Sequence, residues 1–171
     1  MKVTALKISD IKLIEPEVFE DERGYFFESF NQKKFNKAIR QDIRFIQDNQ
    51  SKSKKGVLRG LHYQEEPFAQ GKLVRTIKGE IFDVAVDIRK DSRTYGQWVG
   101  EILSADNRKQ LWIPPGFAHG FLTMTDDAEF LYKTTEFYSK EHERCIHWKN
   151  NDFDITWPAL NTSIVTSLKD S

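Results

Sequence analysis

The chain has 171 residues, with 26 lysines and arginines balanced by 26 aspartates and glutamates. This length can bury a substantial core, and no linker or composition shift divides it, so we predict one domain over residues 1–171. Balanced charge argues against nucleic acid or an anionic membrane as a partner, and no apolar run is long enough to span a membrane.

Period-2 patterning and turn residues predict a chain made mainly of short strands. The expected strands cover residues 3–8, 25–28, 45–50, 57–63, 72–77, 80–88, 97–103, 110–113, 120–124 and 129–137. One helix is expected over residues 31–40, where Phe35, Ala38 and Ile39 join Phe30 in a narrow apolar face. Many short strands with a minor helix indicate an all-β jelly-roll barrel, whose interior suits a small ligand.

Local features sharpen this picture. Lys78-Gly79 is typical of a hairpin turn joining the strands on either side of it. Residues 80–88 alternate as in a half-buried strand, with Asp83 on the polar side. Asp126-Asp127 marks a turn before the last strand, and the lysine-rich residues 52–55 are expected to form a solvated turn.

A histidine motif lies at residues 114–121, which run Pro-Pro-Gly-Phe-Ala-His-Gly-Phe and resemble the second motif of cupins. In metal-binding cupins a His-x-His pair and a glutamate from a first motif complete the ligand set. Here residues 60–64 run Gly-Leu-His-Tyr-Gln, so Gln64 replaces the second histidine. His62 and His119 alone make a poor transition-metal site. We therefore expect no metal and no cofactor, with both histidines acting as acid, base or hydrogen-bond donor.

The whole set of motifs resembles the dTDP-4-dehydrorhamnose 3,5-epimerase family over nearly the full chain. The segments that carry the resemblance are residues 21–28, 47–51, 56–64, 69–75, 83–89, 114–121, 131–135, 155–158 and 167–170. The resemblance implies a metal-free cupin-type jelly roll that acts as a homodimer. It also implies inversion of C3 and C5 of a nucleoside-diphospho-4-keto-6-deoxyhexose, with dTDP-4-dehydro-6-deoxy-D-glucose as the expected substrate, in deoxysugar precursor synthesis for polysaccharides.

The same resemblance assigns catalytic roles. His62 is the expected base, Lys72 the cation beside the C4 oxygen, and Tyr132 the proton donor across the sugar ring. A neutral imidazole suits proton abstraction near pH 7, and a cation beside an enolate favours the transition state. Asp170 is the expected partner that orients His62, with Asp83 as the competing carboxylate.

Other residues are implied in substrate binding. Arg23 and Arg59 offer planar guanidinium groups that match a diphosphate. By resemblance, the remaining contacts to nucleotide, sugar or diphosphate are Phe26, Glu28, Gln47, Asn49, His119, Tyr138, Glu143 and Lys169, with Phe26 and Tyr138 packing on the base. On pattern alone, His62 and Tyr132 would be packed strand residues and His119 a cap of the preceding turn.

Strand geometry raises a difficulty, because strict alternation sends Arg59 and His62 to opposite faces. We predict a bulge at Gly60 that restores both to one pocket. Two segments depart from the family pattern: residues 65–68 are more acidic and bulky than expected, and Asp170 lies near the end of a short chain, where ordering is often poor.

Several alternatives stay open from the sequence. They are an epimerase acting at C3 alone or C5 alone or on a related nucleotide sugar, a metal-dependent cupin oxygenase or isomerase, and a non-catalytic carbohydrate-binding cupin. We expect a homodimer because open jelly rolls expose strand edges, and residues 23–28 could then complete the neighbour's pocket. Cys145 has no partner for an internal disulfide and no signal-like segment opens the chain, so a cytoplasmic location is expected.

Overall fold

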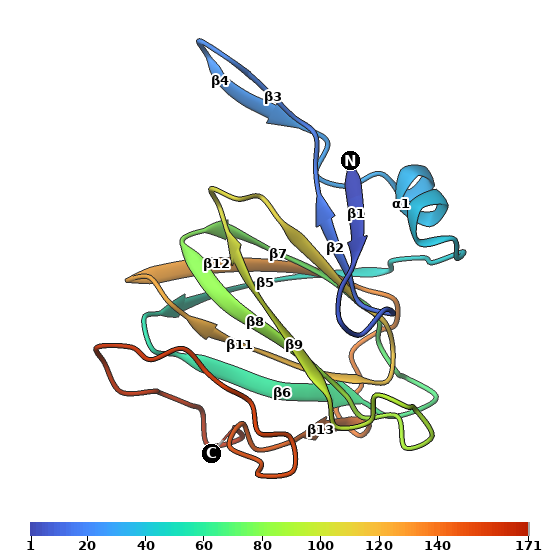
Figure 1. Cartoon of the computed structure of the whole chain (residues 1–171), viewed down its shortest axis with the longest axis vertical. Helices are drawn as coiled ribbons and strands as arrows, with labels where there is room; N and C mark the ends of the chain where they lie inside the picture. The colour runs from blue at the N-terminus through green and yellow to red at the C-terminus, as the bar shows by residue number, and fades with distance from the viewer. Residues whose placement is uncertain (171) are drawn as a thin grey trace.

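Two antiparallel sheets face each other in the computed structural model, which describes residues 1–170 (Figure 1). One sheet has the order β1 (Lys2–Ala5), β2 (Lys12–Glu15), β10 (Gln110–Ile113), β7 (Lys72–Lys78), β12 (Asp127–Thr134) and β5 (Gln47–Lys54). The other has the order β13 (Glu143–Cys145), β6 (Leu58–Gln64), β11 (Phe117–Thr123), β8 (Glu80–Asp87) and β9 (Trp98–Ser104). The predicted all-β jelly roll is confirmed.

The main core lies between these two sheets. Alternate side chains of both sheets meet there, including Val74 and Phe130 from the six-stranded sheet and Ile81, Leu103 and Phe121 from the five-stranded sheet. Each of these five side chains is at most 4% exposed. Their burial removes apolar surface from water, which is the dominant favourable term in folding.

The single helix, α1 (Gln32–Ile39), covers the outer face of the six-stranded sheet. Asn31 caps its N-terminus by accepting a hydrogen bond from the Lys34 backbone N–H, as its residue type favours. Phe35 packs edge-on against Trp112 of β10, with ring centroids 5.4 Å apart. The predicted helix is confirmed to within one residue at each end.

The outer face of the five-stranded sheet is also covered, which corrects the prediction for β8. Val84 and Val86 pack beneath Phe153 and neighbouring residues of the C-terminal segment. The polar side of the strand, with Asp83, faces the barrel interior and is fully buried. β8 is therefore buried on both faces, whereas the alternating pattern predicted a half-buried strand. The C-terminal segment covers one face and the barrel interior encloses the other.

The turn at Gly79 is not a hairpin turn. Its φ of +71° suits glycine, but the strands that it joins lie in different sheets, with β7 between β10 and β12 and β8 between β11 and β9. The chain crosses from one sheet to the other here, so the hairpin prediction is wrong. Turn chemistry identified the bend, while the partners of each strand depended on the whole sheet.

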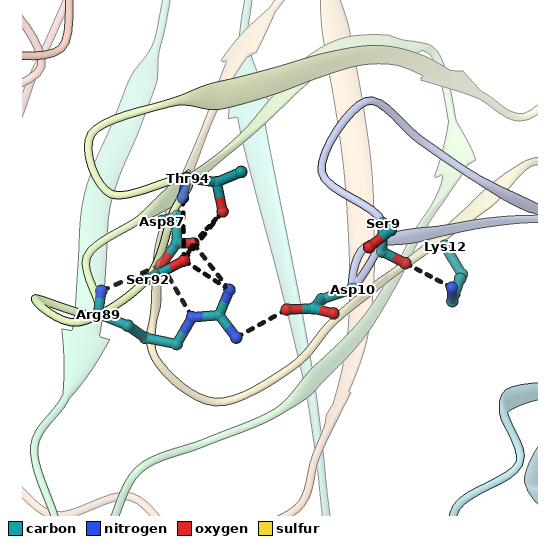
Figure 2. Close-up of polar contacts among 7 residues, drawn as sticks. All are labelled: Ser9, Asp10, Lys12, Asp87, Arg89, Ser92 and Thr94. Carbon is teal, nitrogen blue, oxygen red and sulfur yellow. Dashed lines mark hydrogen bonds and ion pairs between the residues drawn. The ribbon is translucent and has the colours of Figure 1, made fainter.

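A polar network fixes the loop after β8 (Figure 2). The buried carboxylate of Asp87 accepts hydrogen bonds from Arg89, Ser92 and Thr94, and Arg89 also pairs with Asp10 at 2.7 Å. These donors lower the pKa of Asp87 against the opposing effect of burial. The network ties the β1–β2 loop to the β8–β9 loop at one end of the barrel.

Several boundaries differ from the sequence prediction. Strands β2, β13 and β3 (Val18–Asp21), which are three or four residues long, were not predicted from the sequence. β5 continues through Lys54, so residues 52–54 are a strand and not the expected solvated turn. Residues 52–54 continue the antiparallel ladder with β12, and Lys52 also forms an ion pair with Asp127.

A two-stranded hairpin of β3 and β4 (Gly24–Phe27) projects from the barrel (Figure 1). Phe19 and Tyr25 are each 59% exposed and Phe26 is 71% exposed. Elsewhere, no helix within residues 1–170 is long and apolar enough to cross a membrane.

Candidate active site

A cavity of about 300 Å³ opens into the barrel between the two sheets. The five-stranded sheet contributes one wall through β6, β11 and β13, and the six-stranded sheet contributes the other through β5, β7 and β12. Eight of the predicted site residues line it: Asn49, Arg59, His62, Lys72, His119, Tyr132, Tyr138 and Glu143. The fold thus gathers residues that are up to 94 positions apart, from Asn49 to Glu143, around one space.

The predicted irregularity at Gly60 is present and puts Arg59 and His62 on the same wall. Across β11, His119 is opposite His62 while Phe121 is opposite Arg59, so three steps along β6 match two along β11. Gly60 has a φ of +112°, and a Cβ there would come within 2.6 Å of the His119 carbonyl oxygen. Only glycine fits this position without displacing β11.

His62 and Asp170 form a hydrogen-bonded pair at the cavity. His62 Nε2 lies 2.5 Å from Asp170 Oδ1, and Ser167 donates to the other carboxylate oxygen at 2.8 Å. Although it is close to the end of the chain, Asp170 is only 4% exposed. Burial lowers the pKa of His62, and the nearby Asp170 opposes this effect only in part. The geometry therefore favours a neutral imidazole whose Nε2 proton is held by Asp170, with a lone pair left on Nδ1.

His119 has a different aspartate as its partner. Its Nε2 lies 2.9 Å from Asp83 Oδ2, and neither side chain is more than 8% exposed. Burial raises the pKa of Asp83, opposed by His119 and Lys72. Each histidine thus has its own carboxylate, and the choice between Asp170 and Asp83 for His62 is resolved. His119 lies inside β11, so its interpretation as a turn cap is wrong.

Lys72 is a buried cation without a close carboxylate among residues 1–170. It is 8% exposed, and its Nζ donates a hydrogen bond to the His62 carbonyl oxygen at 3.2 Å. Burial lowers its pKa to about 8, although Asp83 and Glu143 favour the charged form. An ammonium group in such surroundings has unused capacity for an anionic oxygen.

Tyr132 lies on the wall opposite His62. It belongs to β12 in the six-stranded sheet, whereas His62 belongs to β6 in the five-stranded sheet, and both line the same cavity. Phe130, two residues earlier on β12, packs against the Tyr132 ring with centroids 5.6 Å apart. Burial raises the pKa of the Tyr132 phenol, so the hydroxyl stays protonated at neutral pH.

Charged and polar groups surround the mouth of the cavity. Glu143 pairs with Lys169 and accepts a hydrogen bond from the Tyr138 hydroxyl at 2.8 Å. Although burial raises the pKa of Glu143, these two donors lower it below its ordinary value. Arg59 donates to Ser53 Oγ at 3.0 Å, which leaves part of its guanidinium fork available.

Three glutamines hold the backbone of residues 136–139, which carry Tyr138. Gln47 accepts from the Tyr138 N–H, Gln70 donates to the Glu136 carbonyl, and Gln64 bonds both Phe137 and Ser139. Gln47 also donates to Asn49 at 3.0 Å, so it supports the site without lining the cavity. Gln64, which stands where metal-binding cupins have a histidine ligand, therefore hydrogen-bonds the backbone of residues 137–139.

Five predicted binding residues do not line this chain's cavity. Gln47 and Lys169 bond residues that do line it, whereas the other three lie away from it. Arg23 and Phe26 lie on the projecting hairpin, where Arg23 pairs with Asp21. Glu28 follows the hairpin and bonds Lys34 and Asn31 near the start of α1. Within one copy of the chain, the β3–β4 hairpin therefore adds nothing to the cavity.

The other lining residues were not predicted to belong to the site, although alternation along the strands could have found some of them. Gln64, Phe121 and Phe130 are each two positions from His62, His119 and Tyr132, and therefore share their faces. The remaining ones are Gln50, Ser51, Tyr63, Gln70 and Gly120. Within residues 1–170, His62, Cys145 and Asp170 are the one group of three or more His, Cys, Asp or Glu donors that could hold a metal ion.

Comparisons with known proteins agree with this geometry. A sequence model of the dTDP-4-dehydrorhamnose 3,5-epimerase family matches residues 5–171. Relatives with that activity include proteins from Shigella flexneri, 61% identical over 94% of this chain and 89% of the relative, and Pseudomonas aeruginosa, 57% identical over 97% and 91%. A crystal structure of a dTDP-6-deoxy-D-glucose-3,5-epimerase from Legionella pneumophila, in complex with dTDP-4-keto-L-rhamnose, has a TM-score of 0.95 at 50% identity. The match covers 99% of this chain and 89% of the Legionella chain.

Proposed function

The chain belongs to the dTDP-4-dehydrorhamnose 3,5-epimerase family and is therefore an isomerase. We propose that its cavity holds the 4-keto sugar between β6 and β12. The nucleotide then lies toward the mouth, near Tyr138. The Legionella relative was crystallised with dTDP-4-keto-L-rhamnose, which supports the same class of ligand here.

The reaction needs three chemical groups. The C4 carbonyl makes the C–H bonds at C3 and C5 acidic, so a base can remove either proton and leave an enolate. A cation or hydrogen-bond donor must stabilise the developing oxygen charge. An acid on the other face of the ring must then return a proton, because return from the same face restores the original configuration.

His62 is the base in this proposal. With Nε2–H donated to Asp170, Nδ1 keeps the lone pair that accepts the substrate proton. The imidazolium that forms is stabilised by the Asp170 carboxylate, which remains ionised. Burial keeps the resting imidazole neutral by lowering the pKa of His62.

Lys72 stabilises the enolate. Its buried ammonium lies next to the His62 backbone, donating to that carbonyl oxygen, and is therefore close to where the proton leaves. Its attraction to the C4 oxygen grows as negative charge moves there, so it lowers the energy of the transition state more than that of bound substrate.

Tyr132 is the acid, and its position on the opposite wall is the observation that carries the proposal. A flat sugar enolate between the two sheets presents one face to His62 and the other to Tyr132. The raised pKa of Tyr132 keeps its hydroxyl protonated until a strongly basic enolate carbon is available. Deprotonation from one side and protonation from the other inverts the carbon.

The remaining contacts divide between two copies of the chain. Arg59, Asn49, His119, Glu143 and Tyr138 line the cavity, and Lys169 and Gln47 support them. Arg23, Phe26 and Glu28 would reach the diphosphate and base of a neighbouring subunit through the β3–β4 hairpin, which makes the functional unit a homodimer of single-domain chains. A cytoplasmic location fits this use of a nucleotide-activated sugar.

Proton NMR in deuterated water tests the proposal. Incubation with dTDP-4-dehydro-6-deoxy-D-glucose should replace hydrogen by deuterium at C3 and C5 and give dTDP-4-dehydro-L-rhamnose. Exchange at one carbon only would contradict 3,5-epimerisation. Binding without exchange at either carbon would contradict the assignment of His62 as a base.

A further inference from the structure

A cluster of three metal-ligating side chains lies beside the proposed base. In the β13–β6 pairing, Cys145 is directly opposite His62, so both side chains leave neighbouring strands on the same face. Asp170 reaches both: its Oδ1 lies 2.5 Å from His62 Nε2 and 3.7 Å from Cys145 Sγ. The three donor atoms all lie within 4.8 Å of one another.

We propose that His62, Cys145 and Asp170 form an inhibitory site for zinc or a similar thiophilic divalent cation. One nitrogen, one thiolate and one carboxylate are a donor set typical of Zn²⁺. Zinc–ligand bonds of roughly 2.0–2.3 Å in a tetrahedron place ligand atoms about 3.3–3.8 Å apart. The Cys145–Asp170 separation already matches, and the His62–Asp170 hydrogen bond has only to open by about 1 Å.

This site differs from the metal centre of metal-binding cupins. It shares His62 but takes its other ligands from β13 and the C-terminal turn, while the Gln64 amide is occupied by backbone carbonyls. Ser167 holds the second Asp170 oxygen at 2.8 Å, which orients Oδ1 toward the cluster as an outer-shell partner does. The fourth position of the ion would be left for water.

Metal binding would remove the base. The ion takes the Nε2 lone pair, so the proton that Nε2 donated to Asp170 must move to Nδ1. The Cys145 thiol loses its proton to solvent as its sulfur bonds the metal, so one proton is released for each ion bound. With Nδ1 protonated and Nε2 on the metal, His62 has no lone pair for the substrate C–H proton.

The surrounding charges set the strength of this site. Lys72 and Lys169 act on His62 as cations and weaken metal binding, whereas Glu143 adds negative charge near Cys145. The two nearby lysines favour a reversible inhibitor over a permanent structural ion.

The inhibitory effect rests on the proposed role of His62, while metal binding by the cluster does not. The two are separated by measuring binding and activity on the same samples. Chelator-treated wild-type protein is titrated with Co²⁺, whose thiolate charge-transfer absorption reports Cys145 ligation directly. Zn²⁺ is then titrated into the epimerase assay.

Cys145→Ser and Cys145→Ala are the test variants, since Ser keeps a hydroxyl donor near Asp170 while neither offers a thiolate. Both should keep wild-type activity without metal, lack the cobalt–thiolate band, and need a higher Zn²⁺ concentration for half-inhibition. We expect this shift to be at least the roughly 10- to 100-fold that loss of an outer-shell partner costs in metal affinity. Chelator should restore wild-type activity fully.

Distinct outcomes overturn distinct statements. If wild-type protein shows no cobalt–thiolate band, or if both Cys145 variants are inhibited at the wild-type Zn²⁺ concentration, the metal site is wrong. If the band forms at full occupancy while epimerisation continues unchanged, the site stands and the assignment of His62 as the base fails.

Discussion

The barrel interior and the β3–β4 hairpin both carry residues predicted to bind or act on the substrate, but these residues differ in their exposure and in their hydrogen-bond partners. In the barrel, Lys72 and His119 are less than 9% exposed, and their polar atoms are bonded to neighbours on other strands. On the hairpin, Phe26 is 71% exposed, and within residues 1–170 Arg23 bonds only its near neighbour Asp21. One chain therefore assembles the proposed proton-transfer groups by itself, whereas its hairpin is exposed and, in our proposal, reaches the cavity of a neighbouring subunit.

The largest effect should come from the barrel. His62→Ala is expected to reduce exchange at C3 and C5 by roughly 10²- to 10⁴-fold, because no other base takes the proton from that face. Nucleotide binding, measured by calorimetry with dTDP, should remain. The exposed His147→Ala is the matched control and should behave as wild type. Unimpaired exchange in His62→Ala would move the base to His119.

Tyr132→Phe separates the two walls of the barrel. Inversion should fall by roughly 10²-fold while hydrogen–deuterium exchange persists, because His62 can still remove a proton and return it to the same face. NMR measures both rates in one sample, and the exposed Tyr95→Phe serves as the control. Equal loss of exchange and inversion would make Tyr138 or His119 the better candidate for the acid.

Mixing experiments test the hairpin. Arg23→Ala should raise KM by roughly tenfold or more, the scale for losing a charged diphosphate contact of about 1.5–3 kcal/mol, while Arg44→Ala on another exposed surface should not.

At low substrate concentration, an equimolar mixture of Arg23→Ala and His62→Ala should recover about a quarter of wild-type activity. Half of the dimers are then mixed, and each has one intact cavity.

No recovery after subunit exchange, with mixed dimers demonstrated by mass spectrometry, would show that Arg23 does not act across subunits. A fully active monomer in light scattering would contradict the shared site altogether.

The pH dependence of kcat/KM should reflect two groups of the barrel, the half-buried His62 and the buried Lys72. His62 must be neutral, so activity should fall as pH drops through its pKa, which burial places below 6.5. Lys72 must be charged, so activity should also fall as pH rises above about 8. Lys72→Arg should lose the alkaline limb because guanidinium stays protonated. An alkaline limb that is unchanged in Lys72→Arg would assign it to another group.

The smallest expected effects are on the free energy of unfolding, where substitutions in the barrel and on the hairpin should differ. The pKa of Lys72 is about 8 in the folded chain against an ordinary 10.5, so the unfolded chain binds more protons between these values and wild-type stability should rise with pH there. At pH 7, Lys72→Met should stabilise the fold by ~1–3 kcal/mol. Arg23→Met on the exposed hairpin should stay within ~0.5 kcal/mol. Urea unfolding measures both, and destabilisation by Lys72→Met would show that the buried ammonium is compensated.

Local sequence determined a large part of this molecule. The apolar face of Phe35, Ala38 and Ile39 predicted α1, and strand alternation identified ten of the thirteen strands, because both signals arise from neighbouring residues. Gly60 between Arg59 and His62 was enough to predict the bulge, since both residues had to face one pocket. The motif set also identified the family.

Only the tertiary structure decided which groups meet. Alternation placed Asp83 on the polar side of β8, yet that side is the barrel interior, because the C-terminal segment covers the other face. Gly79 was recognised as a turn, but its two strands pair with distant partners in separate sheets. Asp170, 108 positions after His62, was assigned to it by family resemblance alone, and Cys145 beside them was not anticipated. Sequence patterns report the local environment of the backbone, whereas long-range pairing depends on how the whole chain minimises exposed apolar surface and unpaired polar groups.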